Sequence, residues 1–236
     1  MIVNSVHARS FFTFESPSFH AISASIRLGQ KYQIKRLYDQ AVQYLRGIFT
    51  TDFNKWALLG SMYPQTFNDG YAIGVVNLAR QAGELSMLPT ALLACIALGA
   101  NVIRGFVRED GTREHLSDDD LGLCIAAQRP LYTASTAAVL HTFAPGASPT
   151  CKNKDVCPKV IRSAMKELGG AHVAKMVALN GFSAAYHHFL PDGPNRLCAA
   201  CQKTLGERQQ KEALDVWNRL PTLLGIDVPG WGARAS

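Results

Sequence analysis

The stretch from Ile26 to Trp56 reads IRLGQKYQIKRLYDQAVQYLRGIFTTDFNKW and carries a clear periodic pattern. Apolar side chains recur in it at three- and four-residue spacing, at Ile34, Leu37, Tyr38, Ala41, Val42, Leu45 and Ile48. Polar side chains occupy the opposite positions, at Arg36, Asp39, Gln40, Gln43 and Arg46. Because an α-helix places residues three and four apart on one face, the stretch predicts an amphipathic helix with one buried stripe.

Other segments of the chain carry the same helical period. Helices are predicted over 68–82, in the run after Pro89, from Ser117 with three aspartates in its first turn, from Pro130 onward, near 160–168, over 172–189 and from about 201 to 220. Asp110-Gly111 is flanked by polar residues rather than by alternating strand-like runs, so no hairpin is predicted there. The fold class that follows is all-α, an irregular helical bundle.

Proline, glycine and serine mark the predicted internal boundaries. The run APGASPT at 144–150 is the clearest loop, and a turn is predicted at 191–194. We therefore divide the chain into an N-terminal region (1–60), a helical region (61–145) and a cysteine-containing helical region (146–236). At 236 residues and 47% hydrophobic composition, these regions are expected to pack as one compact unit.

The residue identities in this first helical stretch carry information beyond their periodicity. Ile-Arg-Leu-Gly-x-Lys-Tyr at 26–32, Ala-Val-x-Tyr-Leu at 41–45 and Thr-Asp-Phe-x-x-Trp at 51–56 resemble the fungal (basidiomycete-type) family of BTB/POZ-domain proteins. The resemblance continues in YAIGVVNLAR (71–80), SMLPTAL (86–92), IRGFVREDGT (103–112), LSDDDL (116–121), LCAAC (197–201), VW (216–217), RLP (219–221) and GW (230–231). It implies the last BTB helices followed by a helical extension. Only residues 1–25 precede this segment, so the BTB sheet is expected to be missing.

The BTB/POZ resemblance also implies a class of function. Members of the family are protein-interaction modules, so we expect a non-enzymatic adaptor or scaffold linked to cullin-type ubiquitin ligases or to transcriptional complexes. A partner surface is expected around Phe19, Tyr32, Lys35 and Arg36. A truncated or degenerate BTB copy without a role of its own is a further alternative.

Six cysteines supply the strongest chemical pattern. Cys151-x5-Cys157 follows the loop, and Cys198-x2-Cys201 lies at the entry to the last predicted helix. Four thiolates form a tetrahedral zinc site that leaves no open position, so such a site is structural rather than catalytic. The sequence thus predicts one structural zinc at these four residues, with free thiols as the alternative. Cys95 and Cys124 lie on apolar helix faces and are interpreted as small core residues.

The net charge of +6 and the pI of about 9.1 raise the question of nucleic-acid binding. Basic residues cluster at Lys152, Lys154, Lys159, Arg162 and Lys166, and again at Lys203, Arg208 and Lys211. Acidic residues interleave both clusters, so a solvated helix face is favoured and nucleic acid is not the expected partner. The rival hypothesis is a zinc-stabilised basic nucleic-acid-binding module that uses residues 152–162 beside the cysteines.

Signatures of other classes are missing from the sequence. It contains no GxxxxGK[ST] loop, GxGxxG fingerprint or HExxH motif, so no enzyme activity is predicted. The N-terminus lacks the apolar core of a secretory signal, and the apolar run 88–100 is shorter than a membrane span. We therefore expect an intracellular protein of the nucleus or cytoplasm that does not associate with membranes.

Overall fold

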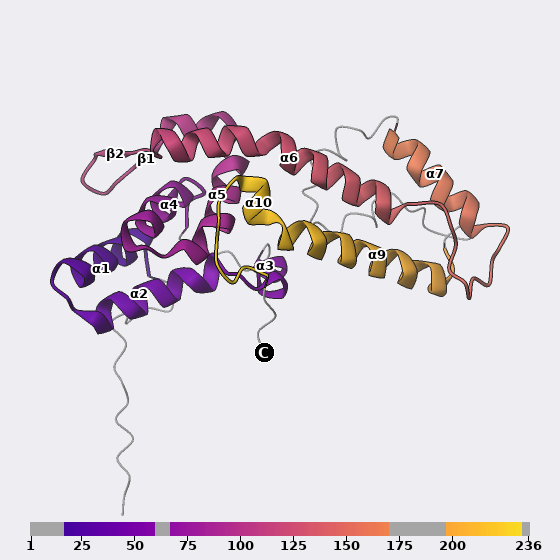
Figure 1. Cartoon of the computed structure of the whole chain (residues 1–236), viewed down its shortest axis with the longest axis horizontal. Coiled ribbons are helices and arrows are strands. Elements are labelled where there is room, and N and C mark those ends of the chain that lie inside the picture. Colours follow the sequence, from indigo (N-terminus) through magenta and orange to yellow (C-terminus); the bar gives the residue numbers. More distant parts are fainter. Residues whose placement is uncertain (1–16, 60–66, 170–196, 233–236) are drawn as a thin grey trace, which may run out of the picture. The chain divides into compact units, whose positions relative to one another are not determined.

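The computed structural model describes residues 17–59, 67–169 and 197–232 (Figure 1). Its elements are almost entirely helical, which confirms the predicted all-α class. The chain forms two compact units, Met1–Ile125 and Ala126–Ser236, whereas the sequence suggested one unit with internal boundaries at 60 and 145. Every helix in the described ranges is too short or too polar to span a bilayer.

The first unit is built from short helices and one small hairpin. Its elements are α1 (Phe19–Lys31), α2 (Lys35–Ile48), α3 (Phe53–Leu59), α4 (Tyr71–Ala82), η1 (Leu85–Met87), α5 (Leu88–Ala97), η2 (Gly99–Arg104), β1 (Phe106–Val107), β2 (Arg113–Glu114) and the start of α6 (Asp118–Thr142). The buried stripe predicted for 34–48 forms α2, where Ala41, Val42 and Leu45 lie in the core. Helix α4 packs against both α1 and α5.

Helices α1 and α2 pack tightly through a glycine. A Cβ atom added at Gly29 would lie 2.8 Å from the backbone nitrogen of Tyr38 and 2.9 Å from the Cβ of Tyr38. The turn between the two helices contains Gln33 at a positive φ of 56°, a conformation that most residues avoid. Close packing therefore explains the glycine of the Arg-Leu-Gly segment, because any side chain at residue 29 would separate the two helices.

Phe19 lies in the core of the first unit. It is 2% exposed and stacks on Tyr71 at 4.8 Å between ring centroids, with Phe67 and Phe106 edge-on to it. The expectation that Phe19 belongs to an exposed partner surface is therefore wrong. The physical reason is that Ser18 caps α1 by accepting the N–H of Ala21, which makes residue 19 the first position of the helix on its buried face.

A short hairpin occurs where none was predicted. Strands β1 and β2 pair antiparallel, with Phe106 opposite Glu114 and Val107 opposite Arg113. Two-residue strands are too short for alternation to be visible in the sequence, and contacts with the rest of the unit hold them. Glu114 accepts hydrogen bonds from Arg27, Arg108 and Asn77.

Ser117 caps the start of α6, as predicted. Its hydroxyl accepts the backbone N–H of Asp120 at 3.1 Å, and the three aspartates occupy the first turn. Asp120 is 3% exposed and also pairs with Arg80, at 2.6 Å from Oδ1 to the guanidinium Nη2. The acidic triplet therefore serves the start of a helix and an ion pair of the core.

Pro130 lies inside α6 rather than at the start of a new helix. A proline at this position removes the hydrogen bond to the carbonyl of Ala126, four residues earlier. Ala126 is exposed, so water can replace the lost donor on that side of the helix. The boundary between the two compact units, Ile125/Ala126, also falls within α6 and not at the loop 144–150.

The second unit contains the end of α6, then α7 (Cys157–Gly169), α9 (Ala199–Asn218) and α10 (Leu220–Leu224). Ala134 and Ala138 of α6 pack with Val216 of α9 and Leu223 of α10. Trp231 lies against Trp217 and donates its indole N–H to the Trp217 carbonyl at 2.8 Å. The helix predicted at 172–189 and the turn predicted at 191–194 lie outside the described residues.

Candidate metal centre

Two segments far apart in the sequence bring four cysteines together. Cys151 lies in the loop before α7, and Cys157 is the first residue of that helix. Cys198 is the N-cap residue of α9, and Cys201 lies in its first turn. The pair Cys151/Cys157 and the pair Cys198/Cys201, each identified from its spacing in the sequence, therefore lie next to each other in the structure.

The sulfur atoms have the spacing of a tetrahedral metal site. All four Sγ atoms lie within 4.8 Å of one another, and the Sγ atoms of Cys151 and Cys198 are 3.9 Å apart. Four sulfurs at about 2.3 Å from a central zinc would be about 3.8 Å apart, so only small adjustments would centre an ion. None of the four cysteines forms a disulfide. The four cysteines could therefore hold one metal ion.

Backbone N–H groups point at these sulfur atoms. The amide of Ser148 donates to Cys201 Sγ at 3.4 Å, and the amide of Cys198 donates to Cys157 Sγ at 3.3 Å. Cys198 Sγ accepts the backbone N–H groups of Cys201 and Lys152. Such donors stabilise negative charge on sulfur and orient the ligands, as the outer shell of a metal site does. These N–H donors therefore favour the thiolate form of the sulfur atoms that accept them.

The thiols differ in their acidity. The backbone N–H groups of Cys201 and Lys152 lower the pKa of Cys198 to about 6, so this residue is a thiolate at neutral pH. Burial raises the pKa of Cys201 to about 12 and also raises the pKa of Cys157. A metal cation would offset the cost of ionising the buried thiols, because its positive charge lies close to all of the sulfur atoms.

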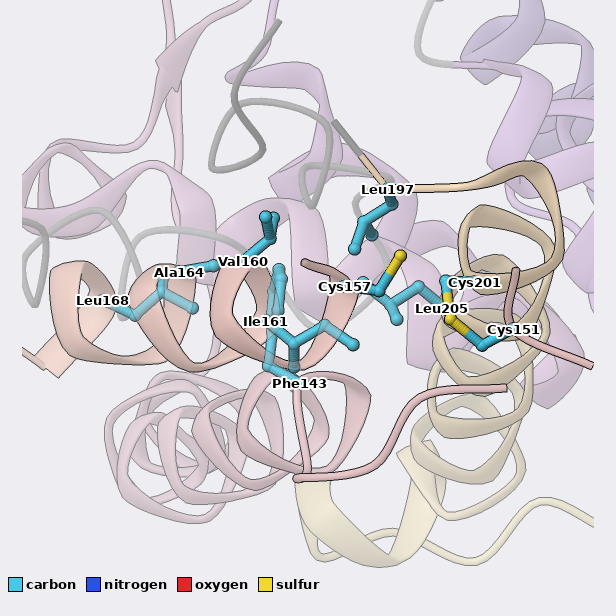
Figure 2. Packing of buried hydrophobic residues seen from close by; sticks show 10 residues of the cluster. All are labelled: Phe143, Cys151, Cys157, Val160, Ile161, Ala164, Leu168, Leu197, Cys201 and Leu205. Atoms are coloured by element: carbon cyan, nitrogen blue, oxygen red, sulfur yellow. The ribbon is translucent and has the colours of Figure 1, made fainter. Parts of the chain in front are cut away.

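The site borders a hydrophobic cluster (Figure 2). Figure 2 shows Cys151, Cys157 and Cys201 beside Phe143, Leu197 and Leu205, with the remaining cluster residues following along α7. Cys157 and Cys201 are fully buried, Cys151 is 7% exposed, and Cys198 is partly exposed. Four thiolates fill a tetrahedral coordination shell and leave no position for a substrate, so the arrangement suits a structural site.

The two remaining cysteines are not part of the centre. Cys95 and Cys124 are buried in the first unit, at 0% and 2% exposure, as expected of core residues. Burial raises the pKa of Cys124 to about 11 and raises that of Cys95 further. Both are therefore neutral thiols at physiological pH.

The proposed partner residues fall in two places. Tyr32 is 61% exposed at the turn between α1 and α2, with the ammonium of Lys31 over its ring. Lys35 and Arg36 are exposed at the start of α2, and Lys35 pairs with Asp39 at 2.6 Å. Phe19, in contrast, lies in the core described above.

Sequence reasoning missed two exposed apolar neighbours of that turn. Leu28 is 46% exposed and Ile34 is 44% exposed. The sequence placed Ile34 on the buried stripe because it continues the helical period of α2. The structure places it immediately before α2 as the N-cap residue, where the period of the helix no longer determines its direction.

No family model, curated protein or solved structure matches this chain.

Proposed function

We propose that this protein is a non-enzymatic protein-interaction module whose second unit is stabilised by one structural zinc ion. The observation that carries the proposal is the set of four sulfur atoms, all within 4.8 Å, at the starts of two helices. Zinc fits because thiolates are soft ligands and a set of four favours tetrahedral coordination. Magnesium and calcium prefer oxygen ligands, so this donor set disfavours them.

The role of the ion would be to join α7 to α9. Cys157 begins α7, Cys151 lies in the loop before it, and Cys198 and Cys201 lie at the start of α9. Among the described residues, the cluster that borders them has ten buried members, three of which are these cysteines. A small unit gains limited stability from its hydrophobic core, and a structural zinc adds the free energy of metal–ligand bonds to it. The second unit would therefore depend on zinc for its fold.

The interaction role rests on the sequence resemblance and on one exposed surface. The segment 26–56 resembles fungal BTB/POZ proteins, whose members act as adaptors. At the turn between α1 and α2, Leu28, Tyr32 and Ile34 are all more than 40% exposed, with Lys35 and Arg36 beside them. Exposed apolar side chains with polar residues at their rim are typical of protein-binding surfaces. A cullin-type ligase subunit is the partner class that the resemblance suggests.

Elemental analysis of the purified full chain tests the zinc proposal. We expect about one zinc per chain, as for a single four-thiolate site, and loss of zinc and of helical circular dichroism in a Cys198→Ser/Cys201→Ser variant. The matched control is Cys95→Ala/Cys124→Ala, which removes two buried thiols of the first unit and should keep the zinc. A zinc-free protein with an unchanged Cys198→Ser/Cys201→Ser spectrum would refute the proposal.

Binding to a recombinant cullin-type subunit tests the interaction surface. Lys35→Glu/Arg36→Glu should weaken binding by at least about tenfold while leaving the fold intact, since both side chains are exposed. The control Lys203→Glu/Lys211→Glu makes the same change in net charge on α9 of the second unit. Equal binding by both variants and the unmodified protein would refute this surface.

A further inference from the structure

The net positive charge of this protein comes from one of its two units. Residues 1–125 contain eleven Lys and Arg against eleven Asp and Glu, whereas residues 126–236 contain thirteen against seven. The whole net charge of +6 therefore belongs to the second unit. Such asymmetry within one chain is typical of proteins that bind a polyanion with one part.

Helix α7 concentrates part of that charge on one face. Lys159, Arg162 and Lys166 are all exposed. At about 100° per residue, these three positions fall within a sector of about 60°, and the ends of the row are separated by about 10 Å along the helix axis. Glu167 falls outside this sector, about 80° from Lys159. Lys152 and Lys154 are exposed in the loop that leads into α7. We call these five cations the α7 basic face.

The charges of the α7 basic face are not neutralised within the described part of the chain. None of its five cations lies within ion-pair distance of a described carboxylate, including the nearby Asp155 and Glu167. The interleaved acids, which favoured a solvated face in the sequence, thus do not pair with these cations.

The second basic cluster, on α9, behaves differently. Lys203 pairs with Glu207 at 3.8 Å, and Lys211 pairs with Asp215 at 3.3 Å. Arg208 donates to the carbonyl of Ala144 at 2.9 Å. The cations of α9 therefore have partners within the fold, whereas those of α7 remain available to an external anion.

The chemistry of the α7 basic face favours nucleic acid over protein. Protein interfaces are depleted in lysine at their centres and enriched in aromatic residues, whereas nucleic-acid interfaces are strongly positive. Among the described residues, no exposed large hydrophobic side chain lies between Leu140 and Leu214. The contacts that the described cations of this face offer to nucleic acid are therefore contacts to phosphates.

We propose that the α7 basic face binds the phosphate backbone of double-stranded nucleic acid. The lysine and arginine side chains would neutralise successive phosphates and release their counterions, without reading the base sequence. This inference goes beyond the proposed protein-interaction role. It needs α7 to be folded but does not need the metal as such.

Titration of the full chain with a 20-base-pair DNA duplex, over a series of salt concentrations, tests the inference. The test variant is Lys159→Gln/Arg162→Gln/Lys166→Gln. The control is Lys55→Gln/Lys203→Gln/Lys211→Gln. It also removes three positive charges, but from lysines that form ion pairs with carboxylates of the fold. Loss of three phosphate contacts should reduce the slope of log affinity against log salt by about 2.7 and weaken low-salt binding by at least about tenfold, whereas the control should retain the original slope.

Three outcomes would overturn the inference. The first is duplex binding by the unmodified protein with no dependence on salt, the second is no duplex binding at all, and the third is a control that loses as much affinity as the test variant. Binding to polyglutamate or to phosphatidylserine vesicles but not to duplex would identify a different polyanion. Zinc content and circular dichroism are measured on the same samples, which keeps this test separate from the metal proposal. Duplex binding that depends on α7, in a folded protein without zinc, would refute the metal proposal alone.

Discussion

The two units differ in how their cores are closed. In the first unit, aliphatic residues from α1, α2, α4 and α5 pack with stacked aromatic rings, and Asp120 and Glu114 pair with arginines. In the second unit, the described cluster around α7 includes Cys151, Cys157 and Cys201, and their sulfur atoms lie within 4.8 Å of one another and of Cys198 Sγ. The contrast is therefore between a core of apolar side chains and one whose described part contains four cysteines that could hold a metal ion.

The largest expected effect is on the second unit when its thiols are removed. Cys157→Ser/Cys201→Ser should lose the metal, at a cost on the order of 10 kcal/mol in metal-binding free energy. It should also bury two polar hydroxyls in the apolar cluster, because both positions are fully buried. Hydrogen exchange followed by mass spectrometry should show backbone amides of 157–168 and 199–205 exchanging rapidly. Amides of α1, α2 and α4 should keep their protection.

The distinction between the two units would be contradicted if Cys157→Ser/Cys201→Ser lowered the hydrogen-exchange protection of backbone amides equally in both. Cys95→Ala/Cys124→Ala is the matched control, because it removes two thiols of similar burial from the first unit. That variant should lower the stability of the first unit by about 1–3 kcal/mol through lost packing, with no change in metal content.

Thiol counting should separate the same two regions chemically. A small thiol reagent at neutral pH should label four cysteines after a chelator removes the metal, and should label Cys95 and Cys124 only after denaturation. The reason is access: loss of the metal should unfold the second unit and expose its four thiols, whereas Cys95 and Cys124 stay buried in the folded first unit. Labelling of all six cysteines at the same rate would contradict the distinction.

The smallest predicted effect concerns helix packing in the first unit. Gly29→Ala should lower the free energy of unfolding by about 1–3 kcal/mol, because the new methyl group would meet the backbone of Tyr38. Gly47→Ala on the exposed side of α2 meets nothing within 4 Å and should stabilise by about 0.5–1 kcal/mol. Chemical denaturation of both variants measures the difference, and equal effects would mean that α1 and α2 are less closely packed than described.

The sequence predicted those features that arise from local pattern. The helical period of 34–48 predicted α2, and the close spacing within each cysteine pair identified all four candidate ligands. Both signals work because the residues concerned are near neighbours in the chain. That the two pairs meet could only be a hypothesis, because it depends on how α7 and α9 pack.

The features that the sequence did not predict depend on tertiary contacts. The hairpin at Phe106 is held by the bonds of Glu114 to distant side chains, and Pro130 is tolerated because its turn of α6 is exposed. The burial of Phe19 follows from its stack on Tyr71, 52 positions later in the chain. The backbone donors to the sulfur atoms, such as the amide of Ser148, leave no trace in residue type and become visible only in the folded chain.

Cobalt substitution tests the central claim, a tetrahedral site of four thiolates, most directly. Titration of the metal-free full chain with Co²⁺ should reach saturation at about one equivalent and give intense visible bands of tetrahedral cobalt together with thiolate-to-cobalt charge transfer, and zinc should then displace the cobalt. The Cys198→Ser/Cys201→Ser variant should give neither signal. Weak octahedral absorption from the unmodified protein, without charge transfer, would contradict the account.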